Sequence, residues 1–223
     1  MSIDSLVSTP EKTMFPPGVP ISKRLFDLVL VIPRIILISP LLGLIALLVW
    51  IKHGRPIFFK QTRPGYRGQP FGVIKFRTMM DAYSSTGELL PDSERLTNVG
   101  QFLRSTSMDE LPEIFNVFSG KMSLVGPRPL LMQYLDRYTP EQARRHDVLP
   151  GMAGWAQVNG RNLLSWEDKF HMDVWYVDNW SIGLDIKILG LTFWKVLKRE
   201  GISQPGHATS EEFMGSPEKV EDN

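Results

Sequence analysis

The chain has 223 residues, of which 43% are hydrophobic and 22% are charged. This is enough for one domain with a sizeable core, and the composition excludes a disordered or low-complexity protein. The formal net charge is +1, so no overall positive field indicates nucleic-acid binding. There is no cysteine, which excludes disulfides and thiolate metal sites.

Both ends of the chain are polar. Residues 1–22 are largely polar or proline-rich and lack an amphipathic period, so we expect a flexible, solvated tail. Residues 203–223 are also polar and predict a second tail. The residues between them, 23–202, are then expected to form a single domain.

An almost wholly apolar segment, Leu25–Ile51, opens this domain. It is long enough to cross a bilayer, which takes roughly 20 apolar residues. Pro40 follows Ser39 in mid-segment, where a proline removes a backbone donor and predicts a kink. The Ser39 hydroxyl can satisfy a carbonyl that the proline leaves free, which makes a break tolerable within a membrane.

Basic residues flank this segment on both sides, and the positive-inside rule therefore places both of its ends in the cytoplasm. A kinked, re-entrant helix over residues 23–54 fits both the kink and the charges, whereas a straight span fits the length alone. A buried helix of a soluble protein is disfavoured because the segment has almost no polar face. The flanking basic residues are Lys23 and Arg24 before the segment, and Lys52 and Arg55 after it.

A β-hairpin is predicted next, because two runs rich in Phe, Ile and Val flank a turn that contains proline and glycine. Beyond it the pattern predicts a polar loop, two helical regions separated by the Gly126–Pro129 loop, a further loop, and two helices. The predicted ranges are 56–62 and 70–79 for the strands, 81–98 for the polar loop, 102–119 and 130–148 for the helical regions, 150–161 for the further loop, and about 165 onward and 185–199 for the helices.

The last helix carries many apolar residues together with tryptophan and lysine, a composition typical of an interfacial helix. A helix packed in the core of a small domain explains this composition about equally well. The expected fold class is α+β: a mostly helical, monotopic membrane protein with an N-terminal re-entrant kinked helix, a small β-hairpin and interfacial amphipathic helices.

Basic side chains suited to phosphate gather between the hairpin and residue 129. Lys75 and Arg77 alternate and would share one face of a strand. Arg104 precedes an acidic pair, and Arg128 lies between Pro127 and Pro129, which limit where its guanidinium can point. Each arginine alone is more often a surface ion pair, so the evidence for a diphosphate site lies in the set.

The acidic pair Asp109–Glu110 has two readings. Ser107 and Glu110 have the spacing of a capping box, which would make both acids ordinary first-turn residues. Pro112 argues against that, because it would lie too far inside a helix that begins at Ser107; the helix is expected nearer Leu111, with both acids just ahead of it. A carboxylate held there suits a nucleophile or a Mg²⁺ ligand.

Other catalytic patterns are missing from the sequence. The residues around Lys121 lack the glycine spacing of a P-loop, and the four histidines show no metal-ligand spacing. The Gly-x-Ser-x-Gly pattern of a nucleophile elbow does not occur.

Taken together, these motifs resemble the bacterial sugar transferases, the monotopic polyprenyl-phosphate phosphoglycosyl transferases. The resemblance runs from about Lys23 to Gly215. It is carried, in order, by the motifs Lys23-Arg24-Leu25-Phe26-Asp27, Ser39-Pro40, Arg63-Pro64-Gly65, Lys75-Phe76-Arg77-Thr78-Met79, Arg104 with Asp109-Glu110-Leu111-Pro112, Phe115-Asn116-Val117, residues 122–129, residues 150–161 and residues 195–199.

The resemblance implies that Asp109 attacks the phosphate that bears the sugar of a UDP-sugar, releasing UMP, and that undecaprenyl phosphate then takes the phosphosugar. Glu110 would assist, and Mg²⁺ at the acidic pair would neutralise the diphosphate. The substrate-binding residues expected from the motifs are Lys75, Arg77, Arg104, Pro127, Arg128, Pro129 and Arg161.

The small size and the segment 206–215 resemble the subgroup that transfers diacetylbacillosamine-1-phosphate, with departures at Glu212 and Met214. A related acetamido sugar, or a hexose-1-phosphate that starts a polysaccharide, are the alternatives. The resemblance also implies the cytoplasmic face of a bacterial inner membrane, and a possible homodimer that hands its product to downstream glycosyltransferases. A membrane-anchored assembly factor whose acids only cap a helix is the remaining, non-enzymatic hypothesis.

Overall fold

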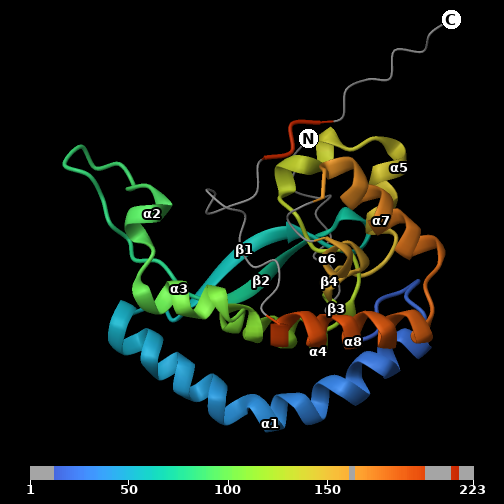
Figure 1. The fold of residues 1–223 in the computed structure, drawn as a ribbon, viewed down its shortest axis with the longest axis horizontal. Coiled ribbons are helices and arrows are strands. Elements are labelled where there is room, and N and C mark those ends of the chain that lie inside the picture. Colours follow the sequence, from blue (N-terminus) through green and yellow to red (C-terminus); the bar gives the residue numbers. More distant parts are fainter. Residues whose placement is uncertain (1–12, 161–163, 199–211, 216–223) are drawn as a thin grey trace, which may run out of the picture.

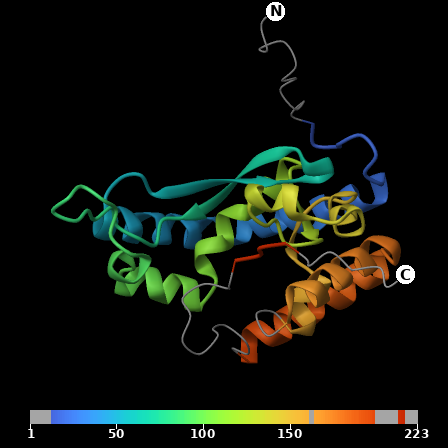
Figure 2. The same ribbon diagram turned by 90° about the horizontal axis from the view of Figure 1, so that it is seen from above.

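The computed structural model describes residues 13–160, 164–198 and 212–215, and shows a mostly helical α+β protein (Figure 1), as expected. Figure 2 shows α7 and α8 at the opposite end of the molecule from α2 and α3. The elements are α1 (Ile21–His53), β1 (Phe58–Pro64), β2 (Pro70–Phe76), α2 (Asp92–Arg95), α3 (Asn98–Ser105), α4 (Ile114–Phe118), β3 (Ser123–Val125), α5 (Pro140–Ala143), β4 (Gly151–Ala153), α6 (Trp155–Asn159), α7 (Trp166–Asp178) and α8 (Ile182–Lys198).

The predicted hairpin is confirmed: β1 and β2 pair antiparallel, from Phe58 opposite Phe76 to Pro64 opposite Pro70. A second, parallel pair joins β3 to β4 and was not expected, because residues 150–161 were predicted to be a loop. These strands can approach each other closely because glycine residues lie where their backbones meet. A Cβ on Gly151 would lie 2.0 Å from the backbone nitrogen of Gly126. Glycine-rich sequence indicates a loop, but here it permits close backbone packing.

The two central helical regions were predicted only in part. Residues 102–119 contain the end of α3, a 3₁₀ turn over Met108–Glu113 and α4, while residues 130–148 break into the 3₁₀ turn Met132–Arg137, α5 and the 3₁₀ turn Arg144–His146. Pro140 is at the start of α5, and Ser165 caps α7 by accepting from the Asp168 nitrogen. The first of these short turns buries Tyr134, whereas α5 buries no side chain.

Helix α1 is one continuous helix that contains Pro33 and Pro40. Figure 1 shows it bent, with both ends rising toward the rest of the protein and the middle farthest away. Ser39 Oγ donates a hydrogen bond of 2.9 Å to the Ile36 carbonyl. In a regular helix this carbonyl would accept from the backbone N–H of residue 40, which Pro40 lacks. Ser39 therefore satisfies the free carbonyl as expected. The helix, however, is bent and continuous, not broken.

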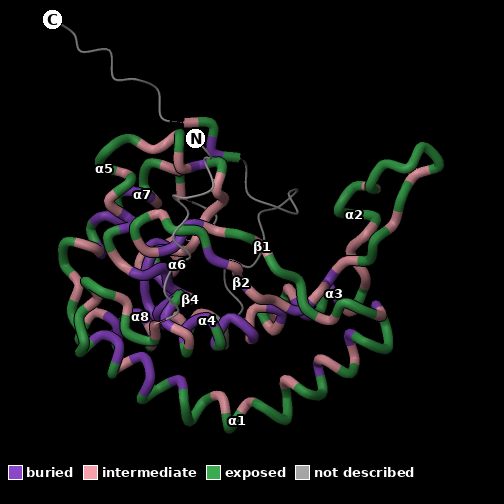
Figure 3. Tube along the Cα trace, turned by 180° about the vertical axis from the view of Figure 1, so that it is seen from behind, coloured by how far each residue is buried: buried purple, intermediate pink, exposed green. Residues whose placement is uncertain are grey.

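Both ends of α1 bury side chains in the domain, whereas its middle contacts the two cores through partly buried side chains such as Ile35, Ile38 and Leu42. Val31 belongs to the main core, and Ile45 and Val49 form a second core with Phe76 and Leu103. The middle is largely exposed, as Figure 3 shows. Within the part of the chain that the structure describes, α1 is the one helix long and apolar enough to cross a membrane. The exposed apolar residues of its middle include Ile36 (71% exposed), Leu37 (80%) and Leu44 (64%).

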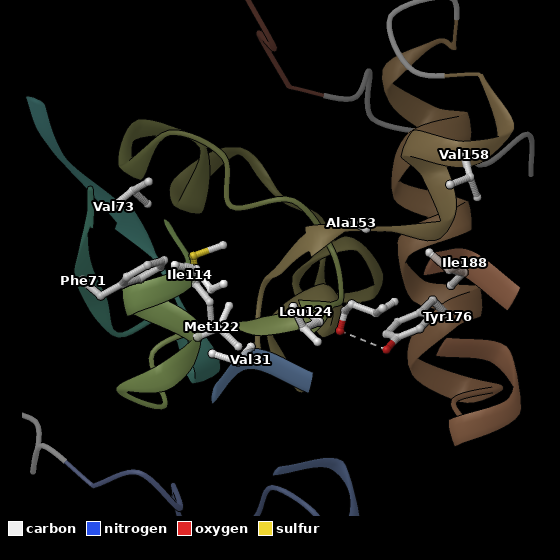
Figure 4. Close-up of a cluster of buried hydrophobic side chains, with 12 residues drawn as sticks. Val31, Phe71, Val73, Ile114, Met122, Leu124, Ala153, Val158, Tyr176 and Ile188 are labelled. Atoms are coloured by element: carbon white, nitrogen blue, oxygen red, sulfur yellow. Dashed lines mark hydrogen bonds between the residues drawn. The ribbon is translucent and has the colours of Figure 1, made fainter. Parts of the chain in front are cut away.

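The main core gathers side chains from both sheets and from the last helices. Figure 4 shows Val73 of the hairpin, Leu124 of β3 and Ile188 of α8 around it, and the hydroxyl of Tyr176 donating to the Val125 carbonyl at 3.1 Å. Helix α8 has a second apolar face, because Phe193 and Trp194 are exposed while Ile188 is buried. It is therefore both a core helix and a helix with an apolar outer surface.

Buried charges attach the start of α1 to this core. Lys23 Nζ donates to Asp185 Oδ2 at 2.6 Å and to the Val125 carbonyl at 2.9 Å. Arg24 pairs with Asp27 at 3.1 Å, and the same Asp27 accepts from the Leu124 nitrogen at 3.0 Å. Lys23 and Arg24 thus point into the protein, so they do not act as free charges flanking a membrane segment.

The described parts of both predicted tails contact the domain. Helix α1 begins at Ile21, and Arg24 Nε donates to the Met14 carbonyl at 2.8 Å, which ties that part of the N-terminal segment to the domain. Near the other end, Phe213 is buried in an aromatic cluster with Tyr134 and Phe170. A single phenylalanine in a polar stretch gives too weak a pattern to predict this docking.

Replacing Asp185 by alanine should strongly destabilise the protein, because Lys23 would stay buried without its counter-charge; breaking a buried pair costs about 3–5 kcal/mol. The matched control is Asp178→Ala, which breaks an exposed pair with Arg144 and should cost less than about 1 kcal/mol. Thermal unfolding in detergent measures both. Equal shifts for the two variants would contradict the anchoring role of the buried pair.

Candidate active site

A cleft of about 920 Å³ lies between the hairpin, the 3₁₀ turn Met108–Glu113, the loop that carries Arg128, and helices α6 and α7. Many of the expected site residues line it. Pro127 and Pro129 flank Arg128 but are not part of the cleft wall, and Arg161 lies outside the described residues. The expected residues that line the cleft are Lys75, Arg77, Arg104, Asp109, Glu110 and Arg128.

The acidic pair lies on the 3₁₀ turn and not on an α-helix. Ser107 just before it has a left-handed backbone (φ 55°), and its side chain makes no capping hydrogen bond. The α-helix begins only at Ile114, three residues later than predicted. The capping-box reading is therefore wrong: the positive φ turns the chain so that Glu110 points away from Ser107 to other partners.

Asn116 fixes this turn against the hairpin, a role that the sequence reasoning missed. The buried side chain donates to the Gly72 carbonyl at 2.7 Å and accepts from the Ile74 nitrogen at 3.2 Å. Both bonds go to the free edge of β2, directly before Lys75. An amide in an apolar helix was the available signal, because a buried amide needs partners outside its own helix.

Glu110 is held between two cations. Its Oε1 lies 2.6 Å from Lys75 Nζ and 2.5 Å from an Arg128 nitrogen. Burial alone would raise the pKa of Glu110, but Arg128 and Lys75 hold it well below its usual range. The same pairing raises the pKa of Arg128. Glu110 is therefore an ionised residue with its charge already neutralised.

Asp109 differs from Glu110 in its burial, in its partners and in the direction of its pKa shift. It is buried at 9% exposure, and it forms no hydrogen bond or ion pair with any residue that the structure describes. Burial, and next the charge of Glu110, raise the pKa of Asp109 to about 6, against the pull of Lys75, Arg104 and Arg128. At neutral pH it is an ionised carboxylate without a partner, which is the state that a nucleophile requires.

Glu113 is a third carboxylate that the sequence reasoning did not select. It is buried, and its Oε1 lies 3.2 Å from Lys75 Nζ on the far side from Glu110. Burial and the charge of Glu110 raise its pKa. Glu113 lies four residues after Asp109 in a turn that faces the hairpin, and that spacing was the missed signal. Lys75 is thereby fixed between two acids.

Arg104 is placed by close packing of α3. A Cβ on Gly100 would lie 1.8 Å from the Thr78 carbonyl, so only glycine lets the helix approach the strand end. One turn later, Arg104 Nε donates to Thr78 Oγ1 at 3.1 Å. Arg77 also lines the cleft, but its guanidinium donates to the Arg55 carbonyl and to Asp81 at 2.7 Å.

A buried ion pair, Arg145 with Asp173, holds the backbone of Arg128 in place. Arg145 donates to Asp173 Oδ2 at 2.7 Å and to the Arg128 carbonyl at 2.8 Å. Both partners of this pair are buried and both line the cleft. The Pro-Arg-Pro loop is therefore held at its backbone, which leaves the Arg128 side chain to reach Glu110.

No group of three or more His, Asp or Glu residues that could hold a metal ion occurs among the described residues. Mg²⁺ commonly binds through one or two carboxylates together with substrate phosphates. The unpaired Asp109 and the neighbouring Glu110 offer oxygen donors of that kind. The donor set therefore fits an ion that arrives with a diphosphate better than it fits a resident metal.

The Asp109→Asn variant should be more stable than the original protein at pH 8. The folded-state pKa of about 6 lies above the ordinary aspartate value of 3.8, so the ionised form is penalised in the folded state. At about 1.4 kcal/mol per pKa unit the penalty is about 3 kcal/mol; it is present above the folded pKa and disappears as the pH falls from 6 toward 4.

Glu110→Gln is the matched control, with the opposite sign, because the pKa of Glu110 is lowered and its ionised form stabilises the fold. Thermal midpoints at pH 8 and pH 4.5 measure both effects. A midpoint for Asp109→Asn at or below that of the original protein at pH 8 would contradict the unpaired, penalised carboxylate.

Comparison with known proteins adds the family. Residues 19–199 match the family described as bacterial sugar transferase. The uncharacterized sugar transferase EpsL of Bacillus subtilis is 57% identical over 196 residues, which cover 88% of this chain and 97% of EpsL.

Two further relatives carry names that state an activity. The UDP-glucose:undecaprenyl-phosphate glucose-1-phosphate transferase of Escherichia coli is 42% identical, over 78% of this chain and 39% of that protein. The undecaprenyl-phosphate galactose phosphotransferase of Salmonella typhimurium is 39% identical, over 80% and 41%. The chain thus spans about two fifths of the length of these two. Because the family match covers most of its residues, the chain belongs to the bacterial sugar transferase family.

Proposed function

We propose that this protein transfers a sugar-1-phosphate from a UDP-sugar to undecaprenyl phosphate through a covalent intermediate on Asp109. The observation that carries the proposal is the contrast between two adjacent carboxylates in one cleft. Glu110 is neutralised by Lys75 and Arg128, while Asp109 has no described partner. The names of the relatives from Escherichia coli and Salmonella support the acceptor and the class of donor.

The proposed reaction has two displacements at phosphorus. An Asp109 carboxylate oxygen bonds to the phosphorus that bears the sugar, the bond from that phosphorus to the bridging oxygen breaks, and UMP leaves. A phosphate oxygen of undecaprenyl phosphate then bonds to the same phosphorus, and the bond to Asp109 breaks. The products are undecaprenyl-diphosphate-sugar and the original carboxylate, so neither step needs an added oxidant or a net proton.

The cations around Asp109 suit the negative charge of both steps. Lys75 and Arg128 already lie at the Glu110 carboxylate, and Arg104 lies on the same cleft wall. Preorganised cations stabilise charge that spreads over phosphoryl oxygens, and they need no rearrangement during reaction. We expect Arg128 to exchange part of its contact with Glu110 for the diphosphate.

Mg²⁺ is proposed as the cofactor, bound to the donor diphosphate with Asp109 and Glu110 as the protein carboxylates. It would supply charge neutralisation to the diphosphate. The chain's own part is to hold Glu110 ionised and to keep an oxygen of Asp109 available.

The sugar has two candidates. The named relatives transfer glucose or galactose phosphate, which favours a hexose. Diacetylbacillosamine or another acetamido sugar is the second candidate, supported by the resemblance of segment 206–215, of which residues 206–211 lie outside the described part of the chain. A homodimer and contact with downstream glycosyltransferases are further proposals that rest on the family resemblance alone.

Incubation with a panel of UDP-sugars, without lipid, should release UMP and add the mass of one phosphosugar to the protein. Intact-mass spectrometry measures this gain, and its value identifies the sugar. The panel contains UDP-glucose, UDP-galactose, UDP-N-acetylglucosamine and UDP-diacetylbacillosamine. No mass gain with any donor, despite turnover when lipid is added, would rule out the covalent intermediate.

The matched variants separate the two acids. Asp109→Asn should lose the mass gain and at least ~10³-fold of turnover, because it removes the attacking oxygen. Glu110→Gln should keep a slower mass gain. The rate of UMP release should rise with pH through about 6 and then level off, since the ionised Asp109 is the reactive form.

We also propose that α1 enters and leaves the cytoplasmic leaflet of the bacterial inner membrane. The support is its bent course (Figure 1), the two prolines within it, and its largely exposed apolar middle between two ends that bury side chains (Figure 3). A membrane-impermeant thiol reagent added to the periplasmic side should label neither Ser2→Cys nor Gly54→Cys. Labelling of Ser2→Cys with Gly54→Cys protected would show a straight span.

A further inference from the structure

Gln157 of α6 contains a buried polar atom without a partner. The residue lies in the wall of the cleft that also contains Asp109. Its Nε2 donates to the Met152 carbonyl at 3.2 Å, while its Oε1 is buried and has no hydrogen-bond partner. The orientation of the amide is set by Met152, because a carbonyl can only accept and must face the NH₂ group. The unpartnered atom is therefore an acceptor.

Helix α6, which carries this amide, is packed between α7 and α8. Trp155 stacks on Trp175 of α7 with ring centroids 5.1 Å apart, and Lys187 Nζ of α8 lies 5.4 Å from the Trp155 ring. Val158, next to Gln157, is buried in the main core. An amide on a short helix held from both sides keeps its position before a ligand arrives.

Glycine provides the space that the amide occupies. A Cβ on Gly154 would lie 2.8 Å from Gln157 Oε1 and 2.6 Å from the Gly126 carbonyl. The oxygen thus lies against a bare Cα, among the apolar side chains that line this part of the cleft. A buried acceptor that lacks a donor costs free energy, and such groups in a folded protein call for an explanation such as a ligand.

We propose that Gln157 Oε1 accepts a hydrogen bond from the bound sugar nucleotide and so helps to select it. This inference rests on the proposed function. Two parts of a UDP-sugar carry a donor by which it could be selected: the imide N–H of the uracil ring, and a hydroxyl or amide N–H of the transferred sugar. The ribose hydroxyls are common to all ribonucleotides and cannot select it. The isoprenoid chain of undecaprenyl phosphate has no donor, so the lipid tail cannot fill this role.

The test compares Gln157→Met with Asn159→Met. Asn159 is on the same helix but is exposed, and among the described residues its amide donates to the Trp155 carbonyl, so this variant controls for damage to α6. Both substitutions are made in the Asp109→Asn background, so that UDP-sugar binds without forming the covalent intermediate. Calorimetry in detergent then gives the dissociation constants of UDP, CDP and the preferred UDP-sugar. Cytidine has an acceptor where uridine has the imide N–H, so the UDP-to-CDP ratio reports contact with the base.

Ratios of affinities are used because a general loss of folded protein leaves them unchanged. A contact with the base predicts that Gln157→Met lowers the preference for UDP over CDP by about tenfold. A contact with the sugar predicts the same loss in the preference for UDP-sugar over UDP, with the UDP-to-CDP ratio retained. Asn159→Met should retain both ratios.

If Gln157→Met keeps both ratios at their original values, the inference is overturned. If the original protein binds UDP-sugar and UDP no better than CDP, the proposed function fails instead, and the two failures are thereby distinguishable. A loss of both ratios in Asn159→Met as well would assign the effect to the packing of α6 and would also overturn a direct contact.

Discussion

The rest of the structure depends on the buried ion pairs at the start of α1. Lys23 reaches Asp185 of α8, and Asp27 accepts from the backbone of β3. Charges are costly to bury, so this region is stable only when each one is matched. The apolar helix is thereby fixed to the core at a defined angle, and it cannot act as an independent anchor. A membrane segment and a catalytic cleft then share one rigid body.

The same rule, that buried charge must be matched, explains how adjacent acids differ. Glu110 lies between Lys75 and Arg128 and is held ionised, whereas Asp109 faces the cleft without a described partner and has a raised pKa. Two adjacent residues therefore differ: the charge of Glu110 is neutralised, whereas the ionised form of Asp109 is destabilised by the fold. The penalty is the thermodynamic cost of keeping a carboxylate ionised in a buried place without a matching charge.

The parallel strands β3 and β4 connect the region of Asp109 and Glu110 to the cleft wall that contains α6. Gly126 and Gly151 allow the two strands to touch at their backbones. One strand leads into the loop of Arg128, and the other leads into α6 and Gln157. Arg145 and Asp173 hold the first loop from below. Two short strands thus position both the cation Arg128, which pairs with Glu110, and the amide of Gln157.

The sequence by itself determined the long apolar helix with its internal prolines, the hairpin and the family, and it singled out the basic residues and the acidic pair that the fold brings into one cleft, because these follow from local pattern and from recognisable motifs. It could not determine that Lys23 and Arg24 turn inward, that Ser107 turns the acids away from a helix cap, or that Glu113 and Asn116 support the hairpin. Those features depend on which distant groups meet, and only the tertiary structure decides how each buried charge is matched.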